Sequence, residues 1–160
     1  MVISHGEKAA LAWGAVHRNQ CTVHTAGAFG DDELYDVRDL LVGMGMQEVI
    51  SYSLTDRATL EGVEAIAGKG PLQIANPMSS QMNLLRTSLR GSMLGTLAAN
   101  RRISQADGLR LFEIGRVYLP REEAKERDLP DERETIAGVL SGPRFPPSWL
   151  AGGTDMGFFD

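Results

Sequence analysis

The sequence is poor in residues that carry nucleophilic, redox or metal chemistry. Its single cysteine, Cys21, cannot form an intrachain disulfide and suits a reducing compartment. All three histidines precede residue 25, so the rest of the chain lacks the base that nucleophile–histidine systems use. A G-x-S-x-G elbow, a P-loop, a Rossmann glycine pattern and an H-E-x-x-H pair are also missing. These absences weigh against the common hydrolase, nucleotide-binding and zinc-protease classes.

The chain also lacks long apolar runs and an excess of basic residues. No run approaches the roughly 20 apolar residues that span a bilayer, and no basic start followed by an apolar stretch marks a signal peptide. The net charge of −5 gives no overall attraction to nucleic acid or to an anionic membrane. With 160 residues, 42% of them hydrophobic, the sequence predicts one domain of a cytoplasmic protein without a membrane segment.

Residues 1–34 have the weakest pattern, because four glycines interrupt it. A short helix is compatible with Glu7–Val16. His17, Cys21 and His24 form an H-x3-C-x2-H grouping, but a structural zinc site usually takes four ligands and no fourth is near. We therefore expect no metal here and interpret residues 1–34 as a leader of uncertain order, followed by a domain over residues 35–160.

From Asp31 onward the spacing of apolar residues predicts regular elements. A helix capped by Asp31 or Asp32 is expected to end at Gly45 in the left-handed conformation. Its apolar positions, at helical spacing, are Leu34, Val37, Leu40, Leu41 and Met44.

Shorter elements are predicted next. Ile50, Tyr52 and Leu54 alternate with two serines, which predicts a strand with one buried face. A short helix at Thr55–Gly62 and a brief strand at Leu72–Ile74 follow, with glycines and Asn76-Pro77 as breaks.

The second half of the chain predicts a helix and a hairpin. Ser88 caps a helix whose arginine pair, Arg101 and Arg102, offsets the helix dipole or contacts RNA; we favour the dipole. Its apolar stripe consists of Leu89, Met93, Leu94, Leu97 and Ala98.

Two strands, Leu109–Leu119 and Thr135–Ser141, flank a charged loop at Arg121–Glu134, so antiparallel pairing is the simplest arrangement. The fold class is therefore α+β, an antiparallel sheet with flanking helices. The helices Glu33–Met44 and Ser88–Arg102 are expected to pack on one of its faces.

Glu113 and Arg116 are the only suggestive charged pair on the predicted sheet. Two positions three apart on a strand point to opposite faces unless a bulge intervenes, and Gly115 suits one. The functional interpretation is an anion or amino-acid pocket on the sheet face. The structural one, which we favour, is a pair of charges satisfied by neighbouring groups.

Three runs of the sequence resemble a known family in their order and spacing. They are DVRDLLVGMGMQEVISYSLTD (residues 36–56), NPMSSQM (76–82) and LLRTSLRGSMLGTLAANRR (84–102), the last followed by LRLFEIGRVYLP (109–120). They resemble the core domain of the phenylalanyl-tRNA synthetase beta subunit over about residues 35–160. The resemblance implies a noncatalytic core with the fold of class II synthetases.

The resemblance also implies that this chain has no catalytic residues and no cofactor of its own. The catalytic alpha subunit has a G-R-V-Y run followed by an arginine, and class II synthetases hold the ATP alpha-phosphate with such a residue. Here the same run is followed by Leu119 and Pro120, and a leucine cannot hold a phosphate. ATP and magnesium belong to the whole synthetase.

The implied partner is the catalytic alpha subunit, in a heterotetramer of two alpha and two beta subunits. tRNA is contacted only through the whole enzyme. An F-[FY]-D segment such as residues 158–160 opens further elements in the family, which implies a domain truncated at its C-terminus. The candidate interface residues are Val37, Leu41, Met44, Trp149, Phe158 and Phe159. For the helix positions the alternative, which we favour, is packing on the domain's own core. For the aromatic tail, covering the domain's own sheet is an equal alternative.

Two alternatives belong to other functional classes. One is a free-standing class II-fold enzyme that forms adenylates, which needs a phosphate-binding arginine where Leu119 stands. The other is an RNA-binding module, which the negative net charge disfavours.

Overall fold

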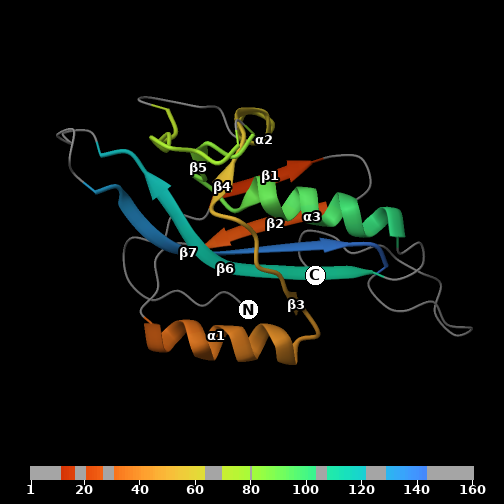
Figure 1. The fold of residues 1–160 in the computed structure, drawn as a ribbon. Helices are drawn as coiled ribbons and strands as arrows, with labels where there is room; N and C mark the ends of the chain where they lie inside the picture. Colours follow the sequence, from red (N-terminus) through yellow and green to blue (C-terminus); the bar gives the residue numbers. More distant parts are fainter. Residues whose placement is uncertain are drawn as a thin grey trace, which may run out of the picture.

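The computed structural model describes residues 12–16, 21–26, 31–63, 70–79, 81–103, 108–121 and 129–143. They form a five-stranded sheet in the order β1-β2-β7-β6-β3, a two-stranded sheet β4-β5, and three helices (Figure 1). The elements are β1 (Ala12–Val16), β2 (Cys21–Ala26), α1 (Asp31–Gly43), β3 (Gln47–Glu48), β4 (Leu54–Thr55), α2 (Arg57–Glu61), β5 (Leu84–Leu85), α3 (Arg90–Ile103), β6 (Leu109–Leu119) and β7 (Asp131–Ser141). The fold is α+β, with a mixed sheet.

The central feature is the hairpin of β6 and β7, whose predicted antiparallel pairing is confirmed. The register runs without interruption from Leu109 opposite Ser141 to Leu119 opposite Asp131. β7 begins four residues earlier than expected, inside the stretch predicted as a charged loop. The charges are accommodated because Arg116 pairs across the strands with Glu132 and Glu134.

One face of this hairpin forms the core with α3. Leu89, Met93 and Leu97 are buried, as the predicted apolar stripe requires, whereas Ala98 at its margin is exposed. These side chains pack against residues that alternate along the two strands, as one face of a pleated sheet demands: Leu111, Val117, Ala137 and Val139. Ser88 accepts a hydrogen bond from the Arg90 N–H at the start of the helix, consistent with its predicted capping role.

The expectation that both long helices share one face is wrong. Gly138 lies opposite Phe112 in the register, between the positions that pack against α3. A Cβ on Gly138 would therefore point to the other face of the sheet, away from α3. Met46, three residues after α1 ends, packs there, with its methyl group 3.4 Å from where a Cβ of Gly138 would be. Figure 1 accordingly shows α1 and α3 on opposite sides of the β6–β7 pair.

The end of α1 is as predicted. Gly45 has a φ of 81°, which favours glycine. Its N–H donates to the Val42 carbonyl, and the Met46 N–H donates to the Leu41 carbonyl, so two terminal carbonyls of the helix are satisfied.

The expected short helix at Glu7–Val16 is wrong for residues 12–16, which form β1. β1 pairs with β2, and β2 pairs with β7 from Cys21 opposite Ser141 to Ala26 opposite Ile136. These two strands therefore extend the main sheet from within the segment interpreted as a leader. His17 lies outside the described residues, and the proposed boundary near residue 34 stays a prediction.

Residues 50–53 are not part of a strand, contrary to expectation, although the segment is followed by β4. Ile50 is 91% exposed and Tyr52 76% exposed, while Ser51 between them is half-buried. The predicted inward and outward faces are thus reversed.

Among the described residues no helix is long and apolar enough to span a membrane.

The short helix α2 is confirmed within the predicted Thr55–Gly62, and Asp56 caps it. The Asp56 carboxylate accepts hydrogen bonds from the Thr59 backbone N–H at 2.8 Å and from the Thr59 hydroxyl at 2.9 Å. The backbone hydrogen bond, and then the hydroxyl one, hold the pKa of Asp56 below its ordinary value of 3.8. The ionised form is therefore the one that stabilises the fold.

We expect Asp56→Ala to lower the free energy of unfolding by about 1 kcal/mol near neutral pH. Because the folded pKa is lowered, the carboxylate contribution is complete above the ordinary pKa and is lost as the pH falls through the folded value. Urea unfolding over a pH series checks this. Asp56→Asn, which keeps an acceptor but does not ionise, is the matched control. A deficit of Asp56→Ala that is unchanged in strong acid would contradict the assignment.

Candidate functional site

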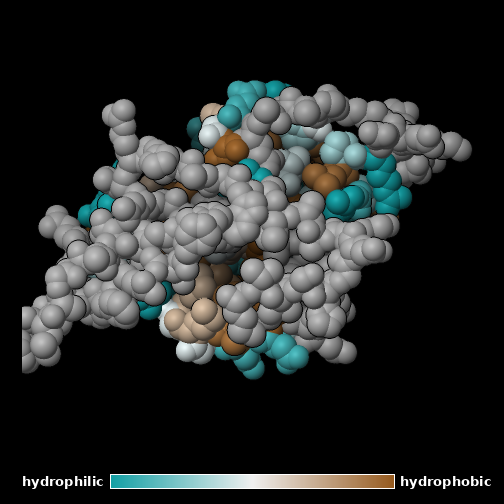
Figure 2. Space-filling view, turned by 180° about the vertical axis from the view of Figure 1, so that it is seen from behind, coloured by the Kyte–Doolittle hydropathy of each residue, from teal (hydrophilic) through white to brown (hydrophobic). Residues whose placement is uncertain are grey.

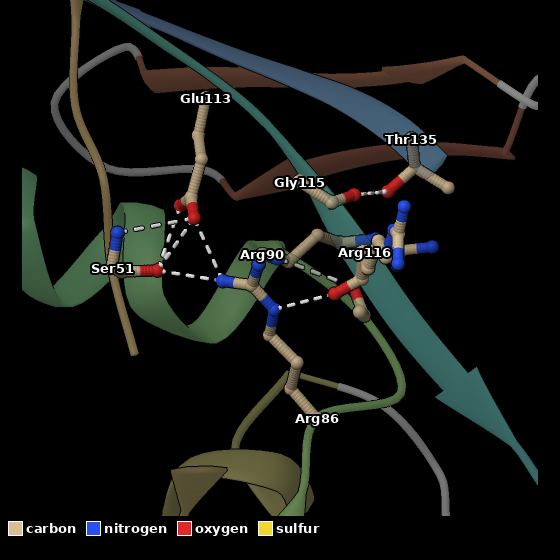
Figure 3. A network of polar contacts seen from close by, with 8 residues as sticks. Ser51, Arg86, Arg90, Glu113, Gly115, Arg116 and Thr135 are labelled. Carbon is tan, nitrogen blue, oxygen red and sulfur yellow. Dashed lines mark hydrogen bonds and ion pairs between the residues drawn. The ribbon is translucent and has the colours of Figure 1, made fainter. Parts of the chain in front are cut away.

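The most distinctive group in the described residues is a buried ion pair between Arg86 and Glu113 (Figure 3). Arg86 follows β5, and Glu113 lies in the middle of β6 on the face that packs against α3. Arg86 Nη1 lies 2.7 Å from Glu113 Oε1, and the side chains are 5% and 1% exposed. Burying two ions costs several kcal/mol for each, so such a pair persists only where further hydrogen bonds satisfy it.

Ser51 supplies those hydrogen bonds on one side. Its hydroxyl lies 2.8 Å from both carboxylate oxygens of Glu113, and its backbone N–H donates to Glu113 Oε1 at 3.1 Å. The same hydroxyl oxygen accepts from Arg86 Nη1 at 2.8 Å. Ser51 therefore bridges both charges, and Figure 3 shows it beside the carboxylate on the segment that leads to β4.

The backbone of β6 completes the surroundings of the guanidinium. Arg86 Nε donates to the Arg116 carbonyl at 2.8 Å. The backbone of Arg86 is fixed as well, since its N–H donates to the Ser53 carbonyl and its carbonyl accepts from the Tyr118 N–H. Gly115 is required for this approach, because a Cβ there would overlap Arg86 Nη2. We call Ser51, Arg86 and Glu113 the buried network.

The arrangement leaves Glu113 and Arg116 apart. Pairing with β7 continues regularly through Gly115 without a bulge, so the two side chains point to opposite faces. Glu113 is enclosed by the buried network, whereas the Arg116 side chain is 59% exposed and pairs with Glu132 at 3.5 Å and Glu134 at 3.7 Å. A joint role of the two residues at a pocket stays a prediction.

The chemistry open to the buried network is limited. Each carboxylate oxygen of Glu113 accepts at least one hydrogen bond, and the guanidinium donates to three acceptors, two on β6 and one on Ser51. Such a satisfied, enclosed pair fits structural positioning better than proton transfer to a substrate. Within the described part of the chain, no three His, Cys, Asp or Glu side chains are grouped so as to hold a metal ion.

Sequence reasoning missed Arg86. The available signal was a cation directly after the apolar pair of β5, opposite in charge to the isolated Glu113. The two residues are 27 positions apart, so only the folded chain reveals that they meet.

A second feature is a set of exposed apolar side chains, which lie between β3 and β4 and along and just after α1. Ile50 and Tyr52, which we call the apolar ridge, project from the segment that carries Ser51. Of the predicted interface residues, Met44 is 61% exposed, whereas Val37 and Leu41 are half-buried. Figure 2 shows hydrophobic residues reaching the surface at the lower edge of the molecule, the level of α1 in Figure 1. The other expected interface residues, Trp149, Phe158 and Phe159, lie outside the described residues.

An ion pair joins α1 to β3 beside this surface. Arg38 Nε lies 2.9 Å from Glu48 Oε1, and its guanidinium lies 5.6 Å from the centre of the Tyr35 ring. The hydrogen bond to Glu48 raises the pKa of Arg38 above its ordinary value, so its charge is constant at any physiological pH.

Comparison with known proteins decides the family. The sequence pattern of the family described as phenylalanyl tRNA synthetase beta chain CLM domain matches residues 32–160. The chain belongs to this family. The match to the synthetase beta chain includes α1 from its second residue onward, the apolar ridge and the whole buried network, whereas β1 and β2 precede it.

Individual members of the synthetase family support this result. The chain is 45% identical over 124 residues to the phenylalanine–tRNA ligase beta subunit of Dehalococcoides mccartyi strain CBDB1, covering 78% of this chain and 15% of that protein. It is 36% identical over 139 residues to the beta subunit of Pseudomonas fluorescens strain Pf0-1, covering 84% and 16%. The chain thus spans about 15% of the length of the first of these relatives.

We expect the effects of changing Arg86 and Glu113 on the free energy of unfolding to be strongly coupled. Glu113→Ala and Arg86→Met should each lower the free energy of unfolding by about 3–5 kcal/mol, because each leaves an unpaired buried charge. The double variant should lose much less than the sum. Urea unfolding of the four proteins measures this coupling.

The matched control is an exposed ion pair of the same kind. Arg57 and Glu61, 64% and 55% exposed, should respond to Glu61→Ala by less than about 0.5 kcal/mol. Additive losses at Arg86 and Glu113 would show that the two residues act independently.

Proposed function

We propose that this chain is a noncatalytic core of the phenylalanyl-tRNA synthetase beta subunit and supports the catalytic alpha subunit. The observation that carries the proposal is a contrast, among the described residues, between charges that are paired within the chain and apolar side chains that are exposed. Glu113 and Arg116 on the long strand β6 form ion pairs within the chain, while large apolar side chains stay exposed on and beside α1. A module built this way suits binding to a protein better than chemistry on a substrate.

Several parts of this proposal come from the synthetase family. The core has the class II fold, the assembly is a heterotetramer of two alpha and two beta subunits, and the location is the cytoplasm. ATP and magnesium serve the whole synthetase and not this chain. tRNA is contacted through the whole enzyme. Leu119 after the G-R-V-Y run supports the noncatalytic assignment, because the family's catalytic subunit has an arginine there.

The alpha-subunit contact is proposed to centre on the apolar ridge and Met44. Ile50, Tyr52 and Met44 are large, apolar and more than half exposed, which is the kind of side chain that carries binding energy at subunit interfaces. Val37 and Leu41 lie half-buried on α1, just before Met44 in the chain, and complete the candidate surface. Trp149, Phe158 and Phe159 remain further candidates by sequence.

The isolated chain is expected to show no phenylalanine-dependent exchange of pyrophosphate into ATP. The reason is that Leu119 stands where the family's catalytic subunit has the arginine that holds the alpha-phosphate. The assay is run on the chain alone and again after addition of a matching alpha subunit. Exchange by the chain alone that Arg116→Ala abolishes would overturn the noncatalytic assignment and favour a free-standing adenylate-forming enzyme.

Binding to the alpha subunit provides the second test. Ile50→Asp should weaken the association by about thirtyfold, the effect of losing one central apolar residue worth about 2 kcal/mol. Ile103→Asp is the matched control, because Ile103 is 84% exposed at the end of α3, away from this surface. Isothermal titration calorimetry with the folded variants measures both. Equal affinities for the two variants would exclude the apolar ridge as a contact.

A further inference from the structure

The segment at residues 49–53 carries its apolar and polar residues in an inverted order. Val49 packs on the core and Ser51 and Ser53 are half-buried, whereas Ile50 and Tyr52 between them are exposed. Turning an extended segment over by a one-residue shift exchanges its two faces. The hydrophobic effect favours that exchange here, because it would bury an isoleucine and a tyrosine in place of a valine and two serines. Something specific must oppose it.

The opposing force lies in the polar attachments of the inward residues. The parallel pairing of β3 with β6 ends at Glu48, after which the Val49 N–H still donates to the Phe112 carbonyl at 2.7 Å. At Ser51 the acceptor becomes the carboxylate of Glu113, which receives both the backbone N–H and the hydroxyl. At Ser53 the carbonyl accepts from the Arg86 N–H at 2.9 Å.

Among these attachments, the hydroxyl of Ser51 is the one that depends on the side chain that now faces inward, because the others use backbone groups. An isoleucine or tyrosine in place of Ser51 has no group that could bridge the carboxylate and the guanidinium at the same distance. Exchanging the faces would therefore leave the buried ion pair without its bridging hydroxyl, and buried polar groups that lose a hydrogen bond incur a desolvation penalty. The ion pair adds little net stability, because well-packed apolar residues of similar volume would give the fold the same stability or more. Its effect is to select one orientation of the segment.

We infer that the buried network positions the apolar ridge: by holding Ser51 inward, Arg86 and Glu113 hold Ile50 and Tyr52 outward for docking to the catalytic alpha subunit. The inference rests on the proposed function for its partner. It assigns Ser51, Arg86 and Glu113 as positioning residues, which act on the interface without touching it.

The test uses Ser51→Ala, which removes the bridging hydroxyl and keeps the ion pair and the backbone. Hydrogen exchange of the amides of residues 49–53 is measured on the chain alone, and affinity for the alpha subunit is measured by calorimetry. Loss of the bridge should speed this exchange and weaken binding by about tenfold each, the size of effect expected from one hydrogen bond. Ser53→Ala is the matched control, because the bond that Ser53 makes to Arg86 uses its backbone carbonyl, which an alanine keeps.

Affinity is measured well below the melting temperature, where a uniform loss of stability leaves the folded fraction and therefore the binding unchanged. A purely structural role of Ser51 would lower the melting temperature alone. The inference is overturned if Ser51→Ala binds as the unaltered chain does while Ile50→Asp binds weakly. Unchanged binding by Ile50→Asp would instead overturn the docking surface itself. The exchange of pyrophosphate separately decides the noncatalytic assignment.

Discussion

The ion pair between Arg86 and Glu113 connects segments that the sheet pairing alone would leave loosely joined. Glu113 belongs to the long hairpin, Arg86 to the turn between β5 and α3, and Ser51 to the segment between β3 and β4. Three pieces of chain thus share one set of charge-assisted hydrogen bonds in a dry environment, where such bonds are strong and their loss is costly. Gly115 permits the approach, and the backbone of β6 supplies the third acceptor. The path of the residues before β4 follows from this arrangement, whereas α3 is held over the sheet by its apolar side chains.

Much of the architecture could be predicted from the sequence, and the reasons are local. The β6 strand and the α3 helix are recognisable because their apolar residues recur with the period of one face, and α1 ends at Gly45 because the chain there needs a positive φ. The family resemblance was also available, because its motifs are short runs in a fixed order. The beta-chain family match confirms it.

The features that could not be predicted depend on distant partners. Ser51 faces inward because of a carboxylate 62 residues away, and no periodicity in its own segment reports that. The charged residues at the start of β7 predict a loop from the sequence alone, and only the pairing with Arg116 explains why they form a strand. The side of the sheet that the end of α1 reaches is fixed by Met46 packing at Gly138, a contact between short stretches with no pattern in common. In each case a local preference was overruled by a tertiary contact.

The hairpin of β1 and β2 has a consequence for the edge of the sheet. β2 covers β7 from Ile136 to Ser141, a stretch without charge, whereas the charged residues Asp131 to Glu134 lie beyond it. Uncharged open edges recruit further strands, and charges deter them. The part of β7 that has no charged residues is thus the part that β2 pairs with. A protein cut back to the family-matched residues 32–160 would lose this cover, and the uncharged stretch of β7 would become an edge of the sheet open to pairing with another chain.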